Sequence, residues 1–332
     1  MPQGHASQPV GKGVRDIEGT VLGLVSQVPK GRVTTFKDVA EALGDPVAAR
    51  AVGAMLAGPE APEECPRHRV VLSDGRVAGS INTARAAARL LAREGIEVRG
   101  DRVVDLETLR FTKFKSSAPL RRLRQEQERL AGRRHPGPLP RQVDRLVGVD
   151  VAYGSGDAAF AAAVEVEVAD FGIVRERGVS LDVDFPYIPT YLGYRELPAV
   201  EAVLDGWDLE GALLLIDGHG TIHPRRFGIA CQVGAALRAP TIGVAKRLLW
   251  GSYDKALLRA EGVAKVLGEG EPVGWAIAPP SGGPVFASPG NMVTLDEALE
   301  LTRRSMGRRQ PVPLELAHQA AEGLKGAAGG GG

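Results

Sequence analysis

The sequence contains few cysteines and no long apolar run. Cys65 and Cys231 are the only cysteines among 332 residues, which excludes a disulfide framework and fits a reducing cytoplasm. No window approaches the roughly 20 apolar residues that a transmembrane helix needs, and the N-terminal residues lack the apolar centre of a signal peptide. We therefore expect a cytoplasmic protein without a membrane partner, and the chain length predicts two domains.

Charge of neither sign dominates the chain, whose formal net charge is +1, but the charges are unevenly distributed. Residues 116–145 contain 8 Lys and Arg against 3 Asp and Glu, whereas residues 146–332 contain 16 against 23. A basic segment beside a carboxylate-rich half fits a phosphate-binding groove next to a metal site. It fits a solvent-exposed basic helix equally well.

The two ends of the chain are poor in apolar side chains and rich in glycine. Residues 1–14 and the tail 326–332 are therefore predicted to be disordered. Between them we expect a first domain of residues 15–115 and a second domain of residues 116–325. The join is short and charged, and residues 121–133 are predicted to form a basic helix.

Short helices separated by glycine characterise the first domain. The helical segment Phe36–Leu43 ends at Gly44, and Pro46 opens the next helix. Two short helices joined by a glycine-containing turn form a helix-turn-helix pattern. A third helix at residues 82–93 and a small hairpin that turns at Gly100 follow.

Three stretches of this region resemble the DNA-binding domain of the alkylguanine-DNA alkyltransferases over roughly residues 16–113: VPKGRVTTFKDVAEALGDPVAARAVGAML, CPRHRVVLSDGRVAG and ARLLAREGIEVRGD. That family carries its nucleophilic cysteine in a Pro-Cys-His-Arg motif, whereas Arg67 stands at the cysteine position here. Arginine has no lone pair to give at neutral pH. The domain is thus similar to the alkyltransferase-like proteins, which keep the lesion pocket without the cysteine. The resemblance implies a winged helix-turn-helix fold and no alkyl transfer.

The same resemblance assigns roles to residues around the lost nucleophile. Arg50 matches the finger that fills the gap left by an extruded nucleotide, and Phe36 matches the aromatic residue that helps to rotate it out. His68 and Glu94 match the residues that activate the missing cysteine. Arg67 would either contact a base or fill the pocket and abolish lesion binding.

Two neighbouring residues bear on this pocket. Pro59 stands where family members usually have Asn, which alters the hydrogen bonding expected there. Cys65 lies two residues before the lost nucleophile. We interpret Cys65 as inert, because Pro66 fixes the turn between the two positions and the family spacing is not kept.

Apolar strands and acidic residues characterise the second domain. Residues 213–216 form a continuous apolar run that predicts a strand buried on both faces, with Asp217 at its carboxyl end. Residues 146–153 predict a strand that carries Asp150, and residues 162–169 alternate as a half-exposed strand. Strands followed by alternating helices and strands predict an α/β domain with a mixed central sheet.

Three acids are candidate metal ligands: Asp150, Asp217, and Glu196 at the start of a predicted helix. Adjacent central strands would bring Asp150 and Asp217 together, and a hard divalent cation such as Mg²⁺ or Mn²⁺ relieves the repulsion of converging carboxylates. Such a site activates water for phosphodiester cleavage. Three scattered acids alone do not distinguish this site from a solvated surface.

Five motifs of the second domain resemble endonuclease V, in its order and at its spacing, over roughly residues 120–325: GVDVAY, FPYIPTYLGYRELPAV, LLLIDGHGTIHPRRFGIA, PTIGVAK and FASPG. The resemblance implies a ribonuclease-H-like fold. It also implies Mg²⁺-dependent nicking of nucleic acid one nucleotide beyond a deaminated base, chiefly inosine, with Mn²⁺ as a substitute metal. By position, Asp150, Glu196 and Asp217 match the metal-binding acids, and His223 and Lys246 match residues near the scissile phosphate.

Further roles follow from the same resemblance. Tyr187 matches a wedge that fills the gap left by the extruded base, Arg195 matches an arginine that contacts the backbone, and the turn Gly218–Gly220 matches a cradle for the base. One departure is the family motif Ser-Pro-Gly-His, in which Asn291 replaces a histidine that we take as an active-site residue. Asn is neutral and cannot act as a base, so activity would be reduced, shifted in metal preference or lost; we favour a working enzyme, because the three acids, His223 and Lys246 are all present.

Together the two resemblances predict a DNA repair endonuclease that cuts on the 3′ side of inosine, leaves 5′-phosphate ends, and carries a non-catalytic domain that senses alkylguanine. The first domain would then deliver alkylated sites to the nuclease. Two alternatives remain, a non-catalytic damage-binding adaptor and an inosine-specific endoribonuclease. We expect DNA as the partner, leave RNA open, and favour a monomer.

Overall fold

The computed structural model describes residues 16–58, 64–132, 137–140 and 142–329. These residues form two compact units. The first unit comprises the described residues up to Gln125 together with the segment Phe185–Pro189, and the second comprises Glu126–Asp184 and the residues from Thr190 onward. The predicted disordered residues 1–14, and Pro59 of the lesion pocket, lie outside the described ranges. No helix within those ranges is long and apolar enough to cross a membrane.

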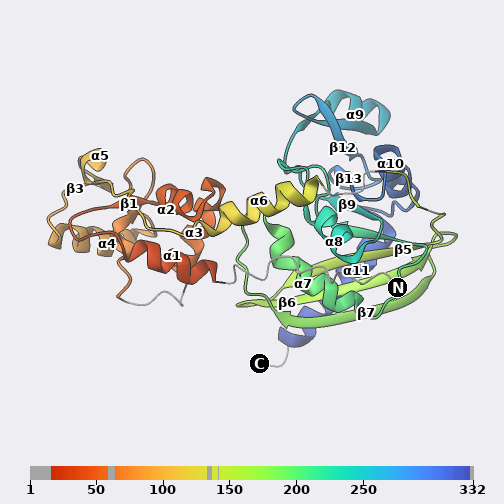
Figure 1. Cartoon of the computed structure of the whole chain (residues 1–332), viewed down its shortest axis with the longest axis horizontal. Helices are drawn as coiled ribbons and strands as arrows, with labels where there is room; N and C mark the ends of the chain where they lie inside the picture. The colour runs from red at the N-terminus through yellow and green to blue at the C-terminus, as the bar shows by residue number, and fades with distance from the viewer. Residues whose placement is uncertain (1–15, 59–63, 133–136, 141, 330–332) are drawn as a thin grey trace, which may run out of the picture. The chain divides into compact units, whose positions relative to one another are not determined.

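The first unit is a small helical domain with a two-stranded wing (Figure 1). The predicted helix-turn-helix pair and the hairpin at Gly100 are both confirmed. Its elements in chain order are α1 (Ile17–Val25), β1 (Thr34–Thr35), α2 (Phe36–Leu43), a 3₁₀ turn (Pro46–Ala48), α3 (Ala49–Ala57), a second 3₁₀ turn (Arg67–Arg69), β2 (Val70–Val71), α4 (Ile81–Arg93), β3 (Val98–Arg99), β4 (Arg102–Val103) and α5 (Leu106–Leu109).

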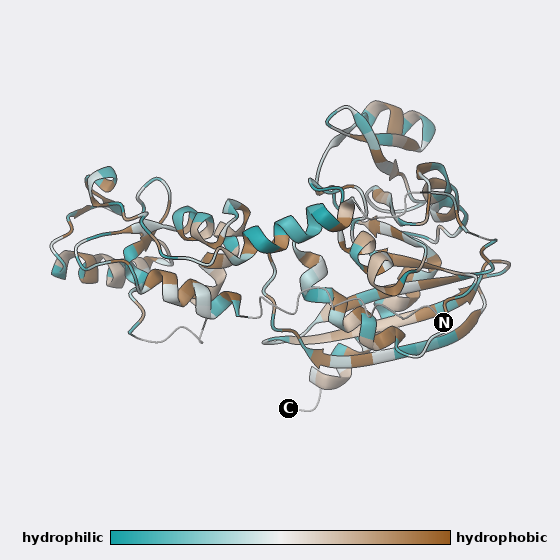
Figure 2. Ribbon diagram, in the orientation of Figure 1, coloured by the Kyte–Doolittle hydropathy of each residue, from teal (hydrophilic) through white to brown (hydrophobic). Residues whose placement is uncertain are grey.

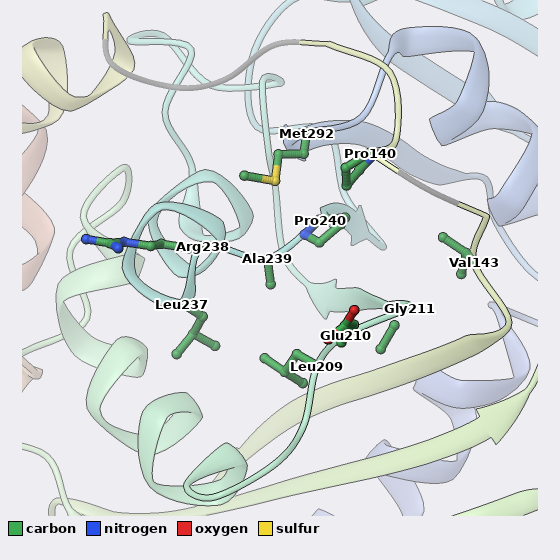
Figure 3. Close-up of a pocket in the computed structure, with 11 residues that line it drawn as sticks. Pro140, Val143, Leu209, Glu210, Gly211, Leu237, Arg238, Ala239, Pro240 and Met292 are labelled. Atoms are coloured by element: carbon green, nitrogen blue, oxygen red, sulfur yellow. The ribbon is translucent and has the colours of Figure 1, made fainter. Parts of the chain in front are cut away.

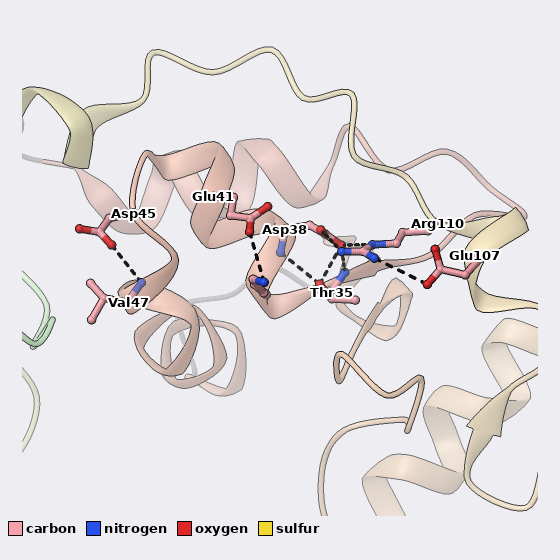
Figure 4. Close-up of polar contacts among 8 residues, drawn as sticks. Thr35, Asp38, Glu41, Asp45, Val47, Glu107 and Arg110 are labelled. Carbon is pink, nitrogen blue, oxygen red and sulfur yellow. Dashed lines mark hydrogen bonds and ion pairs between the residues drawn. The ribbon is translucent and has the colours of Figure 1, made fainter.

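The start of α2 is fixed by a buried carboxylate (Figure 4). Asp38 accepts hydrogen bonds from the backbone N–H and the hydroxyl of Thr35, while its own N–H donates to the Thr35 hydroxyl, which forms a capping box. Arg110 donates two further bonds to the same carboxylate, at 2.9 and 2.7 Å. Burial alone would raise the pKa of Asp38, but the hydrogen bonds from Arg110 and Thr35 outweigh it and lower that pKa.

The helix α6 (Pro119–Ala131) joins the two units, and Figure 2 shows it as mainly hydrophilic. We expected the second domain to begin at residue 116, whereas the two units divide inside α6. The start of α6 packs closely against Gly44 of the first unit, whose φ is +108°. A Cβ added to Gly44 would lie 2.5 Å from the Arg121 N. In the second unit Gln127 donates to the Thr190 carbonyl. A boundary inside a continuous helix leaves no glycine or proline in the sequence to mark it.

The second unit is built on one nine-stranded sheet of order β10-β11-β12-β13-β9-β8-β5-β6-β7. Its elements are β5 (Arg145–Tyr153), β6 (Ala158–Glu167), β7 (Ile173–Asp182), α7 (Leu192–Leu204), β8 (Ala212–Asp217), α8 (Ile229–Leu237), β9 (Thr241–Ala245), β10 (Ser252–Tyr253), α9 (Lys255–Glu261), β11 (Val263–Gly268), β12 (Glu271–Ile277), β13 (Val285–Asn291), α10 (Leu295–Arg304) and α11 (Val312–Gly329). The strands β5, β8 and β9 are parallel and the other pairs are antiparallel, which confirms the predicted mixed sheet.

Helices cover both faces of the central strands, with α7 and α11 on opposite sides (Figure 1). On one face, Val147 and Leu214 pack with apolar residues of α7 and α8. On the other face, Leu146 and Leu213 pack with residues of α10 and α11. The alternation of the two clusters along β5 and β8 follows from the period of two in a strand, so each strand is buried on both sides.

Two predictions about the second unit were wrong. The strand predicted to be half-exposed, β6, is buried because it lies between β5 and β7 under α7 and α11. Its Glu165 is buried and accepts hydrogen bonds from Arg145 and Arg175, at 2.7 and 2.5 Å. The tail predicted to be disordered from residue 326 is helical to Gly329, because α11 continues through it; residues 330–332 lie outside the described ranges.

Replacement of Asp38 by Asn should destabilise the first unit by about 2–4 kcal/mol at pH 7, because one partner of a buried ion pair is lost. The ionised Asp38 stabilises the fold above its unfolded pKa, so the difference from wild type should shrink as the pH falls below about 4. All three tryptophans lie in the second unit. In a urea titration, the unfolding transition of the first unit, followed by circular dichroism, should therefore move to a lower urea concentration. The transition followed by tryptophan fluorescence should stay at the wild-type concentration. The exposed Asp101→Asn is the control, and equal behaviour of the two variants would contradict this account.

Candidate active site

Two carboxylates lie side by side on neighbouring parallel strands, Asp217 at the end of β8 and Asp150 within β5, directly after the residues that pair with β8. The strands β5 and β8 pair with Val149 opposite Ile216, so the next residues, Asp150 and Asp217, lie side by side. Burial raises the pKa of Asp217, and the nearby charge of Asp150 raises it further. The sequence prediction that these two acids meet is therefore in agreement with the structure.

Each of the two acids already has a partner that can carry positive charge. Lys246, directly after β9, donates to the Asp217 Oδ2 at 2.8 Å. Burial would lower the pKa of Lys246, but the charge of Asp217 outweighs it and raises that pKa. His318 on α11 lies with its Nδ1 2.7 Å from the Asp150 Oδ2. An ionised carboxylate only accepts hydrogen bonds, so the Nδ1 carries a proton directed at Asp150.

His318 was missed in the sequence, although it lies closer to a predicted metal ligand than most of the residues that were named. Its helix α11 crosses β5 at Gly148, where a Cβ would lie 2.1 Å from the Pro313 carbonyl oxygen. Only glycine permits this approach, which brings His318 to Asp150. The available signal was the helical spacing of Leu314, Ala317 and Ala321, which places His318 beside the buried face.

Glu196 is the third predicted acid, and it lies buried on α7. Burial raises its pKa to about 8, and the charges of Asp217 and Asp150 act in the same direction. The Tyr153 hydroxyl donates to the Glu196 Oε1 at 3.0 Å and opposes this shift in part. The guanidinium of Arg195 lies 4.3 Å from the centre of the Tyr153 ring. Glu196 is thus protonated or cation-paired when the site functions near neutral pH.

The donor chemistry of this cluster fits a hard divalent cation. Among the described residues, no three His, Cys, Asp or Glu side chains are grouped closely enough to hold an ion as they stand. Asp150 is instead bonded to His318, and Asp217 to Lys246. Mg²⁺ in proteins is usually held by one or two carboxylates with water completing its shell. Asp150 and Asp217 satisfy that requirement, with Glu196 as a further oxygen donor.

His223 is more deeply buried than its predicted role at the scissile phosphate suggests. His223 is only 2% exposed. The Arg225 N–H donates to its Nδ1 at 3.1 Å, so the Nε2 carries the proton and donates to the Thr190 carbonyl at 3.0 Å. Burial, reinforced by the charge of Arg225, lowers the pKa of His223 to about 3. In this arrangement His223 is neutral and both ring nitrogens are used.

The glycine turn after β8 is also occupied by bonds within the protein. The Gly218 N–H donates to the Val244 carbonyl and the Gly220 N–H to the Ser288 hydroxyl. A Cβ on Gly220 would lie 2.1 Å from the Pro289 carbonyl oxygen, so the glycine serves close packing of the turn against β13. The N–H groups of the two glycines are therefore not available to a base, and the expected role of the turn Gly218–Gly220 stays a prediction.

Tyr187, the predicted wedge, has an exposed side chain. It is 62% exposed, whereas its neighbours Phe185 and Ile188 are buried. The buried neighbours anchor the segment and the tyrosine ring projects outward. An exposed aromatic ring on an anchored segment is suited to stacking against a base.

Asn291 corrects an expectation of the sequence. It is 2% exposed, and its Nδ2 donates to the carbonyls of Gly234 and Ala239, at 3.1 and 3.2 Å. Both acceptors lie at the end of α8, away from the acids. Asn291 thus ties β13 to α8, and the histidine that does contact an acid is His318. The motif alone predicts an active-site role for position 291, because the sequence does not show which way the side chain points.

The predicted DNA-contacting residues of the first unit lie around α2 and α3. Arg50, in the first turn of α3, is exposed, and Phe36 begins α2 with its ring against Gly53. Arg67 is exposed and donates to the Leu56 carbonyl at the end of α3, at 3.2 Å. Cys65 is buried, and burial raises the pKa of its thiol despite the charge of Arg67. A raised pKa disfavours the reactive thiolate.

The predicted relay of the first unit is intact without a nucleophile. His68 lies 3.0 Å from Glu94, and Arg69 contacts both oxygens of the same carboxylate. Burial would raise the pKa of Glu94, but the hydrogen bonds from Arg69 and His68 lower it to about 2. Glu94 therefore remains ionised and holds this part of the fold together.

A separate pocket of about 280 Å³ lies at the opposite end of the central strands (Figure 3). Gly211 and Ala212, which line it, are at the start of β8, whereas Asp217 ends that strand. Five residue steps along a strand separate Ala212 from Asp217 by roughly 16 Å. The pocket is thus distinct from the acid cluster.

Comparison with known proteins identifies both units. The chain matches the family model of endonuclease V over residues 129–319, and that of the 6-O-methylguanine DNA methyltransferase DNA-binding domain over residues 16–96. The bifunctional methyltransferase/endonuclease of Picrophilus torridus is 34% identical over 310 residues, which cover 93% of this chain and 97% of that relative. The bifunctional methyltransferase-like/endonuclease of Nanoarchaeum equitans is 30% identical, over 90% of this chain and 87% of that relative.

A solved structure agrees with this identification. The endonuclease V of Streptomyces avermitilis is 38% identical, with a TM-score of 0.55 over 62% of this chain and 92% of that one. Both resemblances drawn from the motifs, and the two-domain prediction, are confirmed. Since the family model matches more than half of the chain and relatives matched over about nine-tenths of it join the same two parts, the chain belongs to the endonuclease V family, as a member fused to a methyltransferase-type DNA-binding domain.

Proposed function

We propose that this protein is a Mg²⁺-dependent DNA repair endonuclease that hydrolyses the phosphodiester bond on the 3′ side of a deaminated base, with inosine as the principal substrate and 5′-phosphate ends as products. The observation that carries the proposal is that Asp150 and Asp217 lie side by side where the parallel pairing of β5 with β8 ends. The match of this chain to the endonuclease V family model, and to a solved endonuclease V structure, supports the proposal.

Asp150 and Asp217 would hold the cation, and Glu196 would contribute a third oxygen or a bond to bound water. A bound Mg²⁺, or Mn²⁺ in its place, supplies activation of water and stabilisation of the leaving oxygen. The remaining chemistry belongs to the protein. The half-exposed ammonium of Lys246 binds a phosphate oxygen, and His318 holds a proton on its Nδ1 that fixes the orientation of Asp150.

Recognition of the base is assigned to Tyr187 and Arg195. Tyr187 enters the stack beside the extruded base, since its ring is exposed on an anchored segment. Arg195 contacts the DNA backbone from the first turns of α7. His223 has no ring nitrogen left for the phosphate, so we assign it to the support of this segment rather than to chemistry.

The first unit binds DNA and senses alkylguanine without reacting with it. Arg50 and Phe36 act on the extruded nucleotide, and Arg67 lies beside the pocket with its guanidinium tied to α3. The buried Cys65 has no route to nucleophilic attack. The relatives are named methyltransferase/endonuclease in Picrophilus torridus and methyltransferase-like/endonuclease in Nanoarchaeum equitans, so this part of the proposal rests on Arg67 and Cys65 and not on those names.

Cleavage of an end-labelled duplex that carries one inosine tests the nuclease directly. Wild type with Mg²⁺ should nick beyond the inosine, and Asp217→Ala should lower the rate roughly a thousandfold because a ligand and a charge are lost. EDTA should abolish the nick and Mn²⁺ should restore it. Asp296→Ala, an exposed aspartate on α10, is the control. Binding without any nick would favour the adaptor alternative, and preference for a matched inosine RNA would favour the endoribonuclease.

Introduction of histidine at position 291 should not increase cleavage. Asn291→His removes a buried donor to two carbonyls, so we expect a loss of about 1–3 kcal/mol in the free energy of unfolding of the second unit. The loss is measured by urea denaturation followed by tryptophan fluorescence, and cleavage is measured at a temperature where both proteins are folded. A gain in cleavage rate would show that position 291 acts in the reaction.

The first unit should bind alkylated DNA without accepting the alkyl group. After incubation with a duplex that carries radiolabelled O6-methylguanine, the label should stay on the DNA for both wild type and Cys65→Ser. Arg50→Ala should weaken binding to the alkylated duplex roughly tenfold, because the extruded nucleotide is no longer replaced. Transfer of label to wild type but not to Cys65→Ser would contradict the assignment.

A further inference from the structure

Thr190, which follows the segment of Tyr187, has an unfavourable backbone conformation. Its φ is +69°, in the left-handed region, where a β-branched residue is an outlier. The strain lies three residues after Tyr187 and two before α7. A strained backbone conformation persists only where surrounding contacts hold it in place, so the contacts of Thr190 show what stabilises this turn.

The Thr190 carbonyl is a hub for three side chains. It accepts from the Gln127 Nε2 at 3.0 Å, from the His223 Nε2 at 3.0 Å and from an Arg225 Nη2 at 2.8 Å. The same Arg225 nitrogen also donates to the Thr190 hydroxyl at 2.7 Å. A carbonyl in a relaxed, extended conformation would point elsewhere and lose these bonds together.

Gln127 completes the hub from the connecting helix. It is 1% exposed, and both atoms of its amide are used, because its Oε1 also accepts from the Arg225 Nε at 2.7 Å. One residue earlier, Glu126 accepts from the Tyr194 hydroxyl at 3.1 Å. The end of α6 thus holds the strained turn and the first turn of α7, which follows it. Gln127 lies before residue 129, where the match to the endonuclease V model begins.

We propose that Gln127 is a positioning residue for base recognition. Through Thr190 and Arg225 it holds the strained turn that directly follows the Tyr187 segment, and so fixes the point at which that segment joins the nuclease unit. This inference rests on the proposed function and deepens it. The last turns of α6 are then part of the nuclease site, and an amide is required because one neighbour needs an acceptor and the other a donor.

Single-turnover cleavage of inosine DNA with Mg²⁺ tests the proposal in a double-mutant cycle. Gln127→Ala should lower the rate roughly tenfold, since a displaced wedge leaves the base poorly extruded. Gln127→Met, which fills the same space without hydrogen bonds, should give a similar loss and guards against a folding defect in the alanine variant. Gln125→Ala, an exposed glutamine on the same helix, should match wild type.

The decisive comparison uses Tyr187→Ala as the background. If Gln127 acts through the wedge, Gln127→Ala should cause no further loss there. An equal loss in both backgrounds, or wild-type rates for Gln127→Ala and Gln127→Met, would overturn the inference while leaving the nuclease assignment intact. A wild-type chain that does not nick inosine DNA would overturn both.

Discussion

The mutual repulsion of the Asp150 and Asp217 carboxylates is the constraint on which the second unit depends. The parallel pairing of β5 and β8 puts both acids at one edge of the sheet, and like charges at short range are unfavourable unless cations lie beside them. Lys246 after β9 provides a positive charge beside Asp217, and His318 on α11 lies within hydrogen-bond distance of Asp150. The close approach of α11 at Gly148 is therefore linked to the chemistry as well as to packing. A bound divalent cation would compensate the charges of the Asp150 and Asp217 carboxylates.

The first unit has kept its framework of charges and changed its reactive position. Glu94 is still held by Arg69 and His68, and its pKa stays low in spite of burial. The exposed Arg67 stands where the resemblance places a nucleophile. Such framework residues stabilise the fold whatever chemistry the domain carries out. A recognition module joined to a nuclease through the helix α6 is consistent with this division of labour.

Structural features that depend on the local sequence pattern, such as the strands of the second unit, were mostly predicted from the sequence. The buried run before Asp217 and the predicted strand that carries Asp150 located two site residues, because strands follow from apolar spacing. His318 was not predicted, since its position depends on how α11 crosses β5, far away in the chain. The burial of Asn291 and the strain at Thr190 were equally inaccessible, because neither the direction of a side chain nor the sign of φ can be read from composition. The unit boundary lies inside α6, where no turn residue marks it.

Binding of a divalent cation is the most direct test of this account. Titration of Mn²⁺ into the intact chain, followed by electron paramagnetic resonance, should reveal a bound population in wild type that is lost when Asp150 and Asp217 are both replaced by Asn. The isosteric change keeps the packing and removes the charge, so unfolding should not explain the loss. Undiminished Mn²⁺ binding in the double variant would contradict the central claim that these two carboxylates form the metal site.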